Sequence, residues 1–88
     1  MNTQLELAQK IVVYDINYNE YDNSIWDVYN KLSNPKIVAE MIRDYSGDRA
    51  YHQDIADDFQ SYTPRTRSVA EDNVKKLNDI LQLLNQFA

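Results

Sequence analysis

The scarcity of glycine and proline narrows the folds open to this chain. Its 88 residues contain one glycine and two prolines. Folds rich in β-strands use both residues in their many tight turns, so this composition favours helices joined by short connectors. Hydrophobic residues make up 43% of the chain, which is enough for a folded core. We therefore expect one all-α domain over residues 1–88, a compact bundle of four to five short helices.

Apolar residues at helical spacing, with capping residues at the breaks, predict where the helices lie. The predicted segments are residues 3–18, 25–32, 35–45, 49–62 and 69–85, with Thr63 and Pro64 as an alternative start of the last one. Gly47 is predicted to end the third segment in the left-handed conformation, and Asp48 to cap the fourth. Asn34 and Pro35 are the residue types favoured at the cap and at the first position of a helix.

Catalytic chemistry has little support in this sequence. The chain has no cysteine and one histidine, His52, whose candidate orienting partner is Asp48 at i−4 on the same helix. A single glycine excludes a glycine-rich loop of the kind that cradles phosphates. The spacing of His52 with Asp48 or Asp57 is too generic to indicate a metal ion. We therefore expect a non-enzymatic protein with no cofactor and no metal site.

The charge balance indicates which partners are disfavoured. Fourteen acidic residues against nine basic ones give a formal net charge of -5. Nucleic acids and anionic membranes are disfavoured as direct partners, whereas a basic protein surface is favoured. The absence of cysteine and of a long apolar run predicts a cytoplasmic protein without a membrane span.

The segment from Tyr14 to Tyr29 is rich in aromatic and acidic residues and contains no lysine or arginine. Tyrosine and tryptophan combine a large apolar area with a polar tip, and they recur at the energetic centres of protein interfaces. The candidate partner-binding residues in this segment are Tyr18, Tyr21, Asp22, Trp26, Asp27 and Tyr29. The alternative is that Trp26 and some of the tyrosines fill the small core, and that the acids are simply solvated.

Three further carboxylates, those of Asp54, Asp57 and Asp58, lie beside an apolar stripe that includes Tyr51 and Phe59. They form either an ordinary solvated face or a continuation of the partner-binding surface. A helical row of carboxylates can imitate some of the phosphate charges of duplex DNA. The sequence thus predicts a small acidic protein that regulates or inhibits a larger basic partner, with a nucleic-acid-handling protein as one candidate. By analogy of size and composition, such chains are common among phage and plasmid accessory proteins.

A different hypothesis makes the protein a DNA-binding regulator that uses its last two helices. The stretch from residue 53 to residue 69 has a weak helix-turn-helix spacing. In that arrangement Arg65, Thr66, Arg67 and Ser68 would contact phosphates or bases. The neighbouring aspartates would repel a phosphate backbone, which counts against this hypothesis.

The last predicted helix raises the question of a homodimer. Ile80, Leu83 and Phe87 widen its apolar surface beyond a single stripe. An apolar surface wider than one stripe is typical of an interface between two copies, so the C-terminal helix is a candidate homodimer seam. The alternative is that all of this surface packs against the other helices of the same chain.

Overall fold

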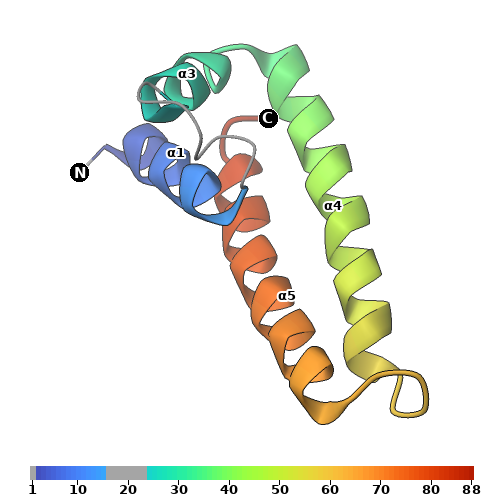
Figure 1. Cartoon of the computed structure of the whole chain (residues 1–88). Coiled ribbons are helices and arrows are strands. Elements are labelled where there is room, and N and C mark those ends of the chain that lie inside the picture. The colour runs from blue at the N-terminus through green and yellow to red at the C-terminus, as the bar shows by residue number, and fades with distance from the viewer. Residues whose placement is uncertain (1, 16–23) are drawn as a thin grey trace.

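The computed structural model describes residues 2–15 and 24–88, and every regular element in these ranges is a helix (Figure 1). The helices are α1 (Thr3–Tyr14), α3 (Ser24–Lys31), α4 (Pro35–Asp57) and α5 (Pro64–Leu84). The predicted all-α class is therefore confirmed. With 23 and 21 residues, α4 and α5 are each about twice the usual length of 11–12 residues.

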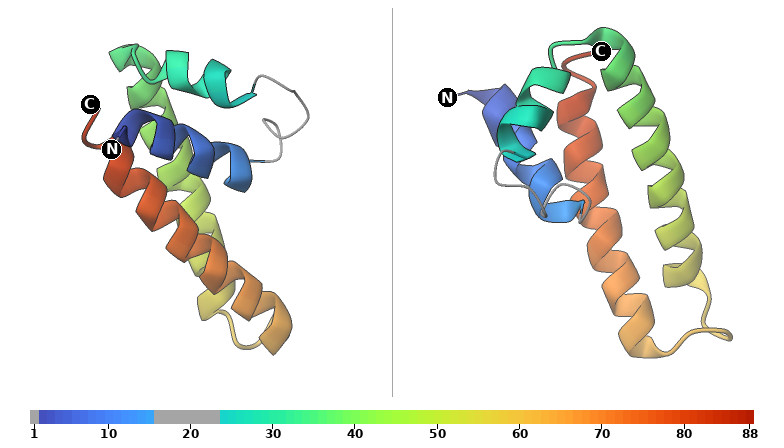
Figure 2. Two further views of the ribbon diagram at one scale, coloured as in Figure 1. Left: turned by 90° about the vertical axis from the view of Figure 1, so that its left-hand side faces the viewer. Right: turned by 45° about the horizontal axis from the view of Figure 1, so that its top comes forward.

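The two long helices form an antiparallel hairpin, and α1 and α3 pack against the end of it that lies opposite the 58–63 turn (Figures 1 and 2). The chain measures 42 × 26 × 22 Å, with a radius of gyration of 14.0 Å. A compact domain of this length has a radius of about 12 Å. The predicted compact bundle of short helices is not confirmed, because part of the hairpin projects beyond α1 and α3.

The predicted break at Gly47 and Asp48 is wrong, because α4 runs through both residues without interruption. Gly47 has no positive φ, so it does not take the left-handed conformation that ends many helices. A glycine inside a helix costs about 0.5–1 kcal/mol relative to alanine. Burial of side chains on both sides of Gly47, including Tyr45 and Ala56, outweighs that cost.

Capping side chains set several of the helix ends. The predicted cap at Asn34 is confirmed, since its Oδ1 accepts a hydrogen bond from the Lys36 N–H at 3.0 Å. The last helix begins at Pro64, the earlier of its two predicted starts, because Thr63 Oγ1 accepts the N–H of Thr66 at 3.2 Å. Each cap satisfies a backbone donor that the first helical turn leaves unpaired.

Two other predicted ends also shift. The first helix is capped by Asn2, whose side chain accepts the Leu5 N–H, and it ends at Tyr14. The predicted continuation to Tyr18 is wrong at Asp15, whose backbone is extended, and residues 16–18 lie outside the described residues. The helix α4 ends at Asp57 rather than near Tyr62, because the next residue forms a turn with the chain that follows.

The hydrophobic core lies where α1 and α3 meet the hairpin. Its buried members are Leu7, Ala8, Ile11, Val12, Val28, Leu32, Val38, Met41, Tyr45, Leu77, Ile80, Leu81 and Leu84. Towards the 58–63 turn, the buried apolar side chains of the two long helices are small ones, Ala56 and Ala70. Consequently the core holds one end of the hairpin firmly, and the other end exposes its larger side chains to solvent.

Candidate protein-binding surfaces

The helix α3 presents one exposed aromatic side chain and one partly buried one. Trp26 is 58% exposed, whereas Tyr29 packs against the core. Their rings meet edge to face with centroids 5.6 Å apart. The carboxylate of Asp27 is exposed and pairs with Lys31 Nζ at 3.1 Å. Trp26 thus does not fill the core, while Tyr29 helps to close it.

The other members of the predicted aromatic surface, Tyr18, Tyr21 and Asp22, lie outside the described residues. Within the described chain, Trp26 and Asp27 are the exposed members of the predicted set on α3. The described part of this surface therefore consists of two groups. One is the Trp26 ring, which contacts Tyr29, and the other is the Asp27 carboxylate, which pairs with Lys31 of the same helix.

The opposite end of the hairpin carries a larger exposed apolar surface. Of the six large hydrophobic side chains that are exposed in the described ranges, four lie between residues 51 and 69, on both sides of the 58–63 turn. These four are Tyr51, Phe59, Tyr62 and Val69. Phe59 is 75% exposed, an unusual exposure for a ring that has no polar atom. Exposed apolar side chains grouped in this way are typical of a protein interaction site.

A shallow hollow of about 310 Å³ lies on this part of α4, and we call it the hairpin-end hollow. Its lining residues are Tyr51, Asp54, Ile55, Asp58 and Tyr62. The first four are spaced three and four residues apart, which places them on one side of a helix. Two tyrosine rings and one isoleucine therefore share a concave surface with two carboxylates.

The three predicted aspartates of this region have different surroundings. Asp54 is exposed, and it makes no hydrogen bond or ion pair with any residue that the structure describes. Asp57 does not line the hollow, and its Oδ1 accepts a hydrogen bond from Gln53 Nε2 at 3.1 Å. The structure thus brings Asp54 and Asp58 together in one hollow and leaves Asp57 outside it.

Asp58 has a structural role in the turn. Its Oδ1 accepts the backbone N–H groups of Gln60 and Ser61 at 3.2 and 3.0 Å. The hydrogen bond from the Ser61 backbone, followed by that from its hydroxyl, lowers the pKa of the Asp58 carboxyl. Arg67 adds a smaller electrostatic contribution in the same direction. This carboxylate is therefore held in place and charged at the edge of the hairpin-end hollow.

The basic residues of the predicted helix-turn-helix motif lie at this end of the hairpin. The guanidinium of Arg67 sits over the Phe59 ring, 4.4 Å from its centroid, while Arg65 is exposed. The helices α4 and α5 run antiparallel along their lengths (Figures 1 and 2). A helix-turn-helix motif instead crosses its helices at roughly 90–120°. The hairpin therefore does not have the geometry that the DNA-binding hypothesis predicts.

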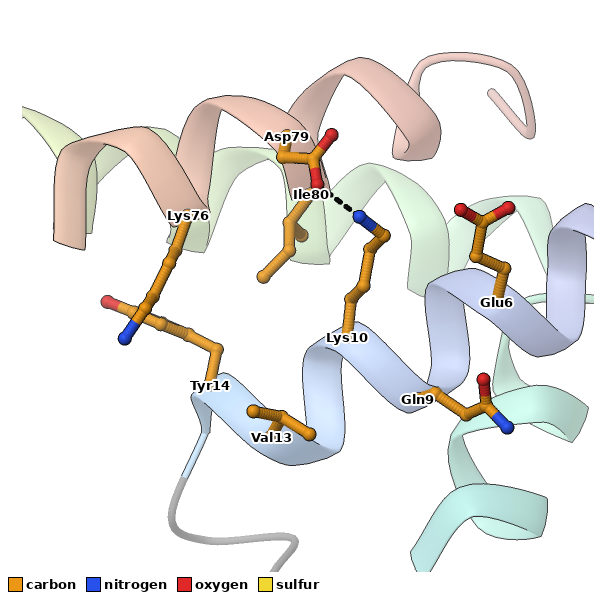
Figure 3. Close-up of a pocket in the computed structure, with 8 residues that line it drawn as sticks. All are labelled: Glu6, Gln9, Lys10, Val13, Tyr14, Lys76, Asp79 and Ile80. Atoms are coloured by element: carbon orange, nitrogen blue, oxygen red, sulfur yellow. Dashed lines mark hydrogen bonds and ion pairs between the residues drawn. The ribbon is translucent and has the colours of Figure 1, made fainter. Parts of the chain in front are cut away.

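A second concave surface lies between α1 and α5, and we call it the α1–α5 groove (Figure 3). It has a volume of about 340 Å³ and is lined by Glu6, Gln9, Lys10, Val13, Tyr14, Lys76, Asp79 and Ile80. The ion pair between Lys10 and Asp79 joins the two helices across it (Figure 3). Two acidic and two basic side chains line this groove, so it has no preference for a charged partner.

The apolar residues of the predicted homodimer seam pack against the hydrophobic core of the same chain. Ile80 is buried, and Leu83 and Phe87 are partly buried against the core. Because the core is assembled from several helices, the sequence of α5 alone did not show how much of its surface the chain itself would cover. Among the described residues, the chain itself thus covers Ile80 fully and Leu83 and Phe87 in part, and a homodimer stays a prediction.

A hydrogen-bonded network that the sequence pattern did not indicate joins α1 to the middle of α4. Tyr14 Oη donates to Asp48 Oδ2 at 2.5 Å, and Asp48 Oδ1 lies 3.8 Å from His52 Nε2. Burial, and then the bond to Asp48, raise the pKa of the Tyr14 hydroxyl far above its ordinary value. This tyrosine is therefore a neutral donor that holds two helices together. His52 stacks on Tyr51, with ring centroids 5.3 Å apart.

In the described ranges, no helix has both the length and the hydropathy that crossing a membrane requires. Within residues 2–15 and 24–88, no three histidine, aspartate or glutamate side chains gather closely enough to hold a metal ion. No protein-family model matches the chain, and neither a curated protein nor a solved structure is significantly similar to it. The case for a function therefore depends on the surfaces described above.

Proposed function

We propose that this chain is a small, non-enzymatic binding protein that regulates or inhibits a larger protein with a basic surface. The observation that supports this most directly is the hairpin end, where Tyr51 and Tyr62 are exposed beside the carboxylates of Asp54 and Asp58, and where Phe59 is exposed as well. No other described helix covers these rings, although they have the residue types that anchor protein interfaces.

The two kinds of side chain contribute differently to such an interface. The rings supply apolar area, and the removal of this area from water favours association. The carboxylates, together with the net charge of -5, raise the rate of encounter with a basic surface and disfavour acidic partners. A nucleic-acid-handling protein is a natural candidate, because it exposes a basic surface to its own substrate. In this role the described aspartates would imitate only a short row of phosphates, since Asp58 also serves the turn.

Trp26 on α3 provides a second exposed anchor at the far end of the molecule. The two ends are far enough apart for a partner to contact either one without the other (Figure 1). Variants at each end can therefore show which surface the partner uses.

The test compares immobilised full-length variants for the proteins they capture from lysate of the source cell. Tyr51→Ala and Phe59→Ala alter the hairpin end, Trp26→Ala alters α3, and Val13→Ala is a matched control at another exposed apolar site. We expect a specific partner that wild type and Val13→Ala retain and that the hairpin-end variants lose. Release of that partner by duplex DNA would identify a nucleic-acid-binding surface as the target. Capture that is equal for all four variants would contradict the proposal.

Direct DNA binding is tested separately. We expect no retardation of duplex DNA by the protein at about 50 mM salt, where phosphate-binding proteins bind strongly. Retardation that weakens steeply as the salt concentration rises would instead support the DNA-binding regulator.

A further inference from the structure

We infer that the hairpin-end hollow receives a single arginine side chain of the partner. The inference rests on the proposed function, because it assigns the chemistry by which the basic partner is recognised. The hollow combines two features that an arginine side chain needs, an apolar wall for its stem and carboxylates for its head.

The apolar wall is formed by Tyr51, Ile55 and Tyr62. A guanidinium is planar and weakly hydrated, so it stacks on tyrosine rings more readily than the compact ammonium of lysine does. A volume of about 310 Å³, open to solvent on one side, suits one extended side chain from a neighbouring surface. An arginine would leave its own backbone outside the hollow, where the rest of the partner contacts Phe59 and its surroundings.

The carboxylates of Asp54 and Asp58 give the hollow its preference for a cation. Asp58 is fixed by the backbone N–H groups of Gln60 and Ser61, so its carboxylate is ordered before any partner arrives. Asp54 forms no ion pair with the described residues, so binding does not require an existing pair to be broken. Guanidinium groups bind carboxylates through two parallel N–H···O bonds, which adds direction to the attraction.

One arginine of the chain itself already stacks on an aromatic ring at this end of the hairpin. The guanidinium of Arg67 lies over the Phe59 ring at 4.4 Å, and its charge acts on Asp58. The Phe59 ring thus already accepts one guanidinium of the chain itself, and Asp58 adds a weak electrostatic attraction. The hairpin-end hollow likewise combines aromatic rings with carboxylates, and it has no arginine among its lining residues.

The α1–α5 groove has no comparable features that would select a ligand. Lys10 is paired with Asp79, and Lys76 with Asp72, so its charges are balanced by neighbours within the chain. Nothing in its lining favours one kind of occupant over another.

The test is a titration of the full-length, isotope-labelled protein followed by the NMR shifts of its backbone amides. The probes are three capped tripeptides that carry arginine, lysine or citrulline between two glycines. Citrulline has the shape of arginine without its charge. We expect saturable shifts at Tyr51, Asp54, Ile55 and Tyr62 with the arginine probe, an affinity several-fold weaker with lysine, and no saturable shifts with citrulline.

Two variants and one control separate the hollow from general acidity. Asp54→Asn and Tyr51→Ala should each weaken the arginine probe at least five-fold, whereas Asp57→Asn removes a nearby charge outside the hollow and should leave binding unchanged. Far-ultraviolet circular dichroism confirms that each variant keeps its helices. Equal weakening by Asp54→Asn and Asp57→Asn, or an arginine probe that causes no saturable shift in the hollow, would overturn the inference.

The two proposals fail in different ways. If the arginine probe does not bind but capture of the partner still depends on Phe59 and Tyr51, the proposed function survives and the arginine inference is wrong. If the probe binds in the hollow but capture does not depend on these rings, the hollow is an arginine site and the proposed function is wrong.

Discussion

The hydroxyl of Tyr14 at the end of α1 donates a 2.5 Å hydrogen bond to the carboxylate of Asp48 in the middle of α4. The two residues are 34 positions apart in the sequence. The Tyr14 ring also meets the Tyr45 ring edge to face, with centroids 6.2 Å apart. This pair of contacts fixes α1 against the hairpin at the boundary between the core and the projecting end.

Removing the Tyr14 hydroxyl should lower stability. We expect Tyr14→Phe to cost about 1–2 kcal/mol of unfolding free energy at pH 7, because a partly buried hydrogen bond to a charged group is lost while the ring is kept. Urea unfolding at pH 7 measures the difference, and Tyr29→Phe is a matched control, since its hydroxyl only accepts a long 3.5 Å bond from Asn2. Equal midpoints for Tyr14→Phe and wild type would show that the contact with Asp48 contributes nothing.

The same contact predicts how stability changes at high pH. Folding raises the Tyr14 pKa, so the folded state binds this proton more tightly than the unfolded state does. Its contribution is fully present below the unfolded value of about 10 and is lost as the pH rises towards the folded value. The stability difference between wild type and Tyr14→Phe should therefore shrink above about pH 10. Lys10 has a raised pKa too, but it is present in both proteins and cancels in the difference.

The contrast between Gly47 and Asn34 shows what the sequence could predict. Asn34 and Pro35 act on the backbone within two residues of themselves, so their residue types alone indicated the helix start correctly. Whether Gly47 ends a helix depends on packing against α5, which is distant in sequence and overrides a local preference. The same reason explains why Ile80 could not be assigned to the core or to a homodimer seam in advance.

The candidate site was predicted in part for a similar reason. The spacing of Tyr51 and Asp54 placed them on neighbouring positions of a helix, and the structure brings both into the hairpin-end hollow. The different roles of Asp57 and Asp58 were not predictable, because the latter depends on where the helix stops. The exposure of Trp26 also depends on which helices pack over α3, so the sequence left core and interface as equal alternatives.

Replacing Gly47 with alanine should stabilise the protein. A Cβ at this position meets no atom within 4 Å, and the backbone is helical with a negative φ. We therefore expect a gain of about 0.5–1 kcal/mol from helix propensity, seen as a rise of several degrees in Tm. A fall in Tm would mean that Gly47 takes a left-handed conformation and that α4 is two helices.

Two substitutions of Asp58 distinguish its hydrogen bonds in the turn from the effect of its negative charge. Asp58→Asn keeps an Oδ1 that can accept the N–H groups of Gln60 and Ser61, whereas Asp58→Ala removes it. We expect a lower urea midpoint for the alanine variant and a smaller change for the asparagine variant. Because folding lowers the Asp58 pKa, its charge stabilises the protein above about pH 4, and this contribution is lost as the pH falls through the folded value. The asparagine variant should lack that part of the acid dependence, and an acid dependence identical to that of the wild type would contradict the assignment.

Trp26 and Val28 lie on the same helix, and their truncation should lower the free energy of unfolding by different amounts. Trp26 is 58% exposed and Val28 is fully buried. We expect Trp26→Ala to cost less than about 1 kcal/mol, although it removes the largest side chain in the protein. Val28→Ala should cost roughly 2 kcal/mol, because it removes two buried methyl groups and leaves a cavity. Urea midpoints measure both, and quenching of the fluorescence of the single tryptophan by acrylamide reports its exposure independently. A loss of 3 kcal/mol or more on Trp26→Ala, of about the size expected for a buried tryptophan, would place this ring in the core and remove it as an anchor for a partner.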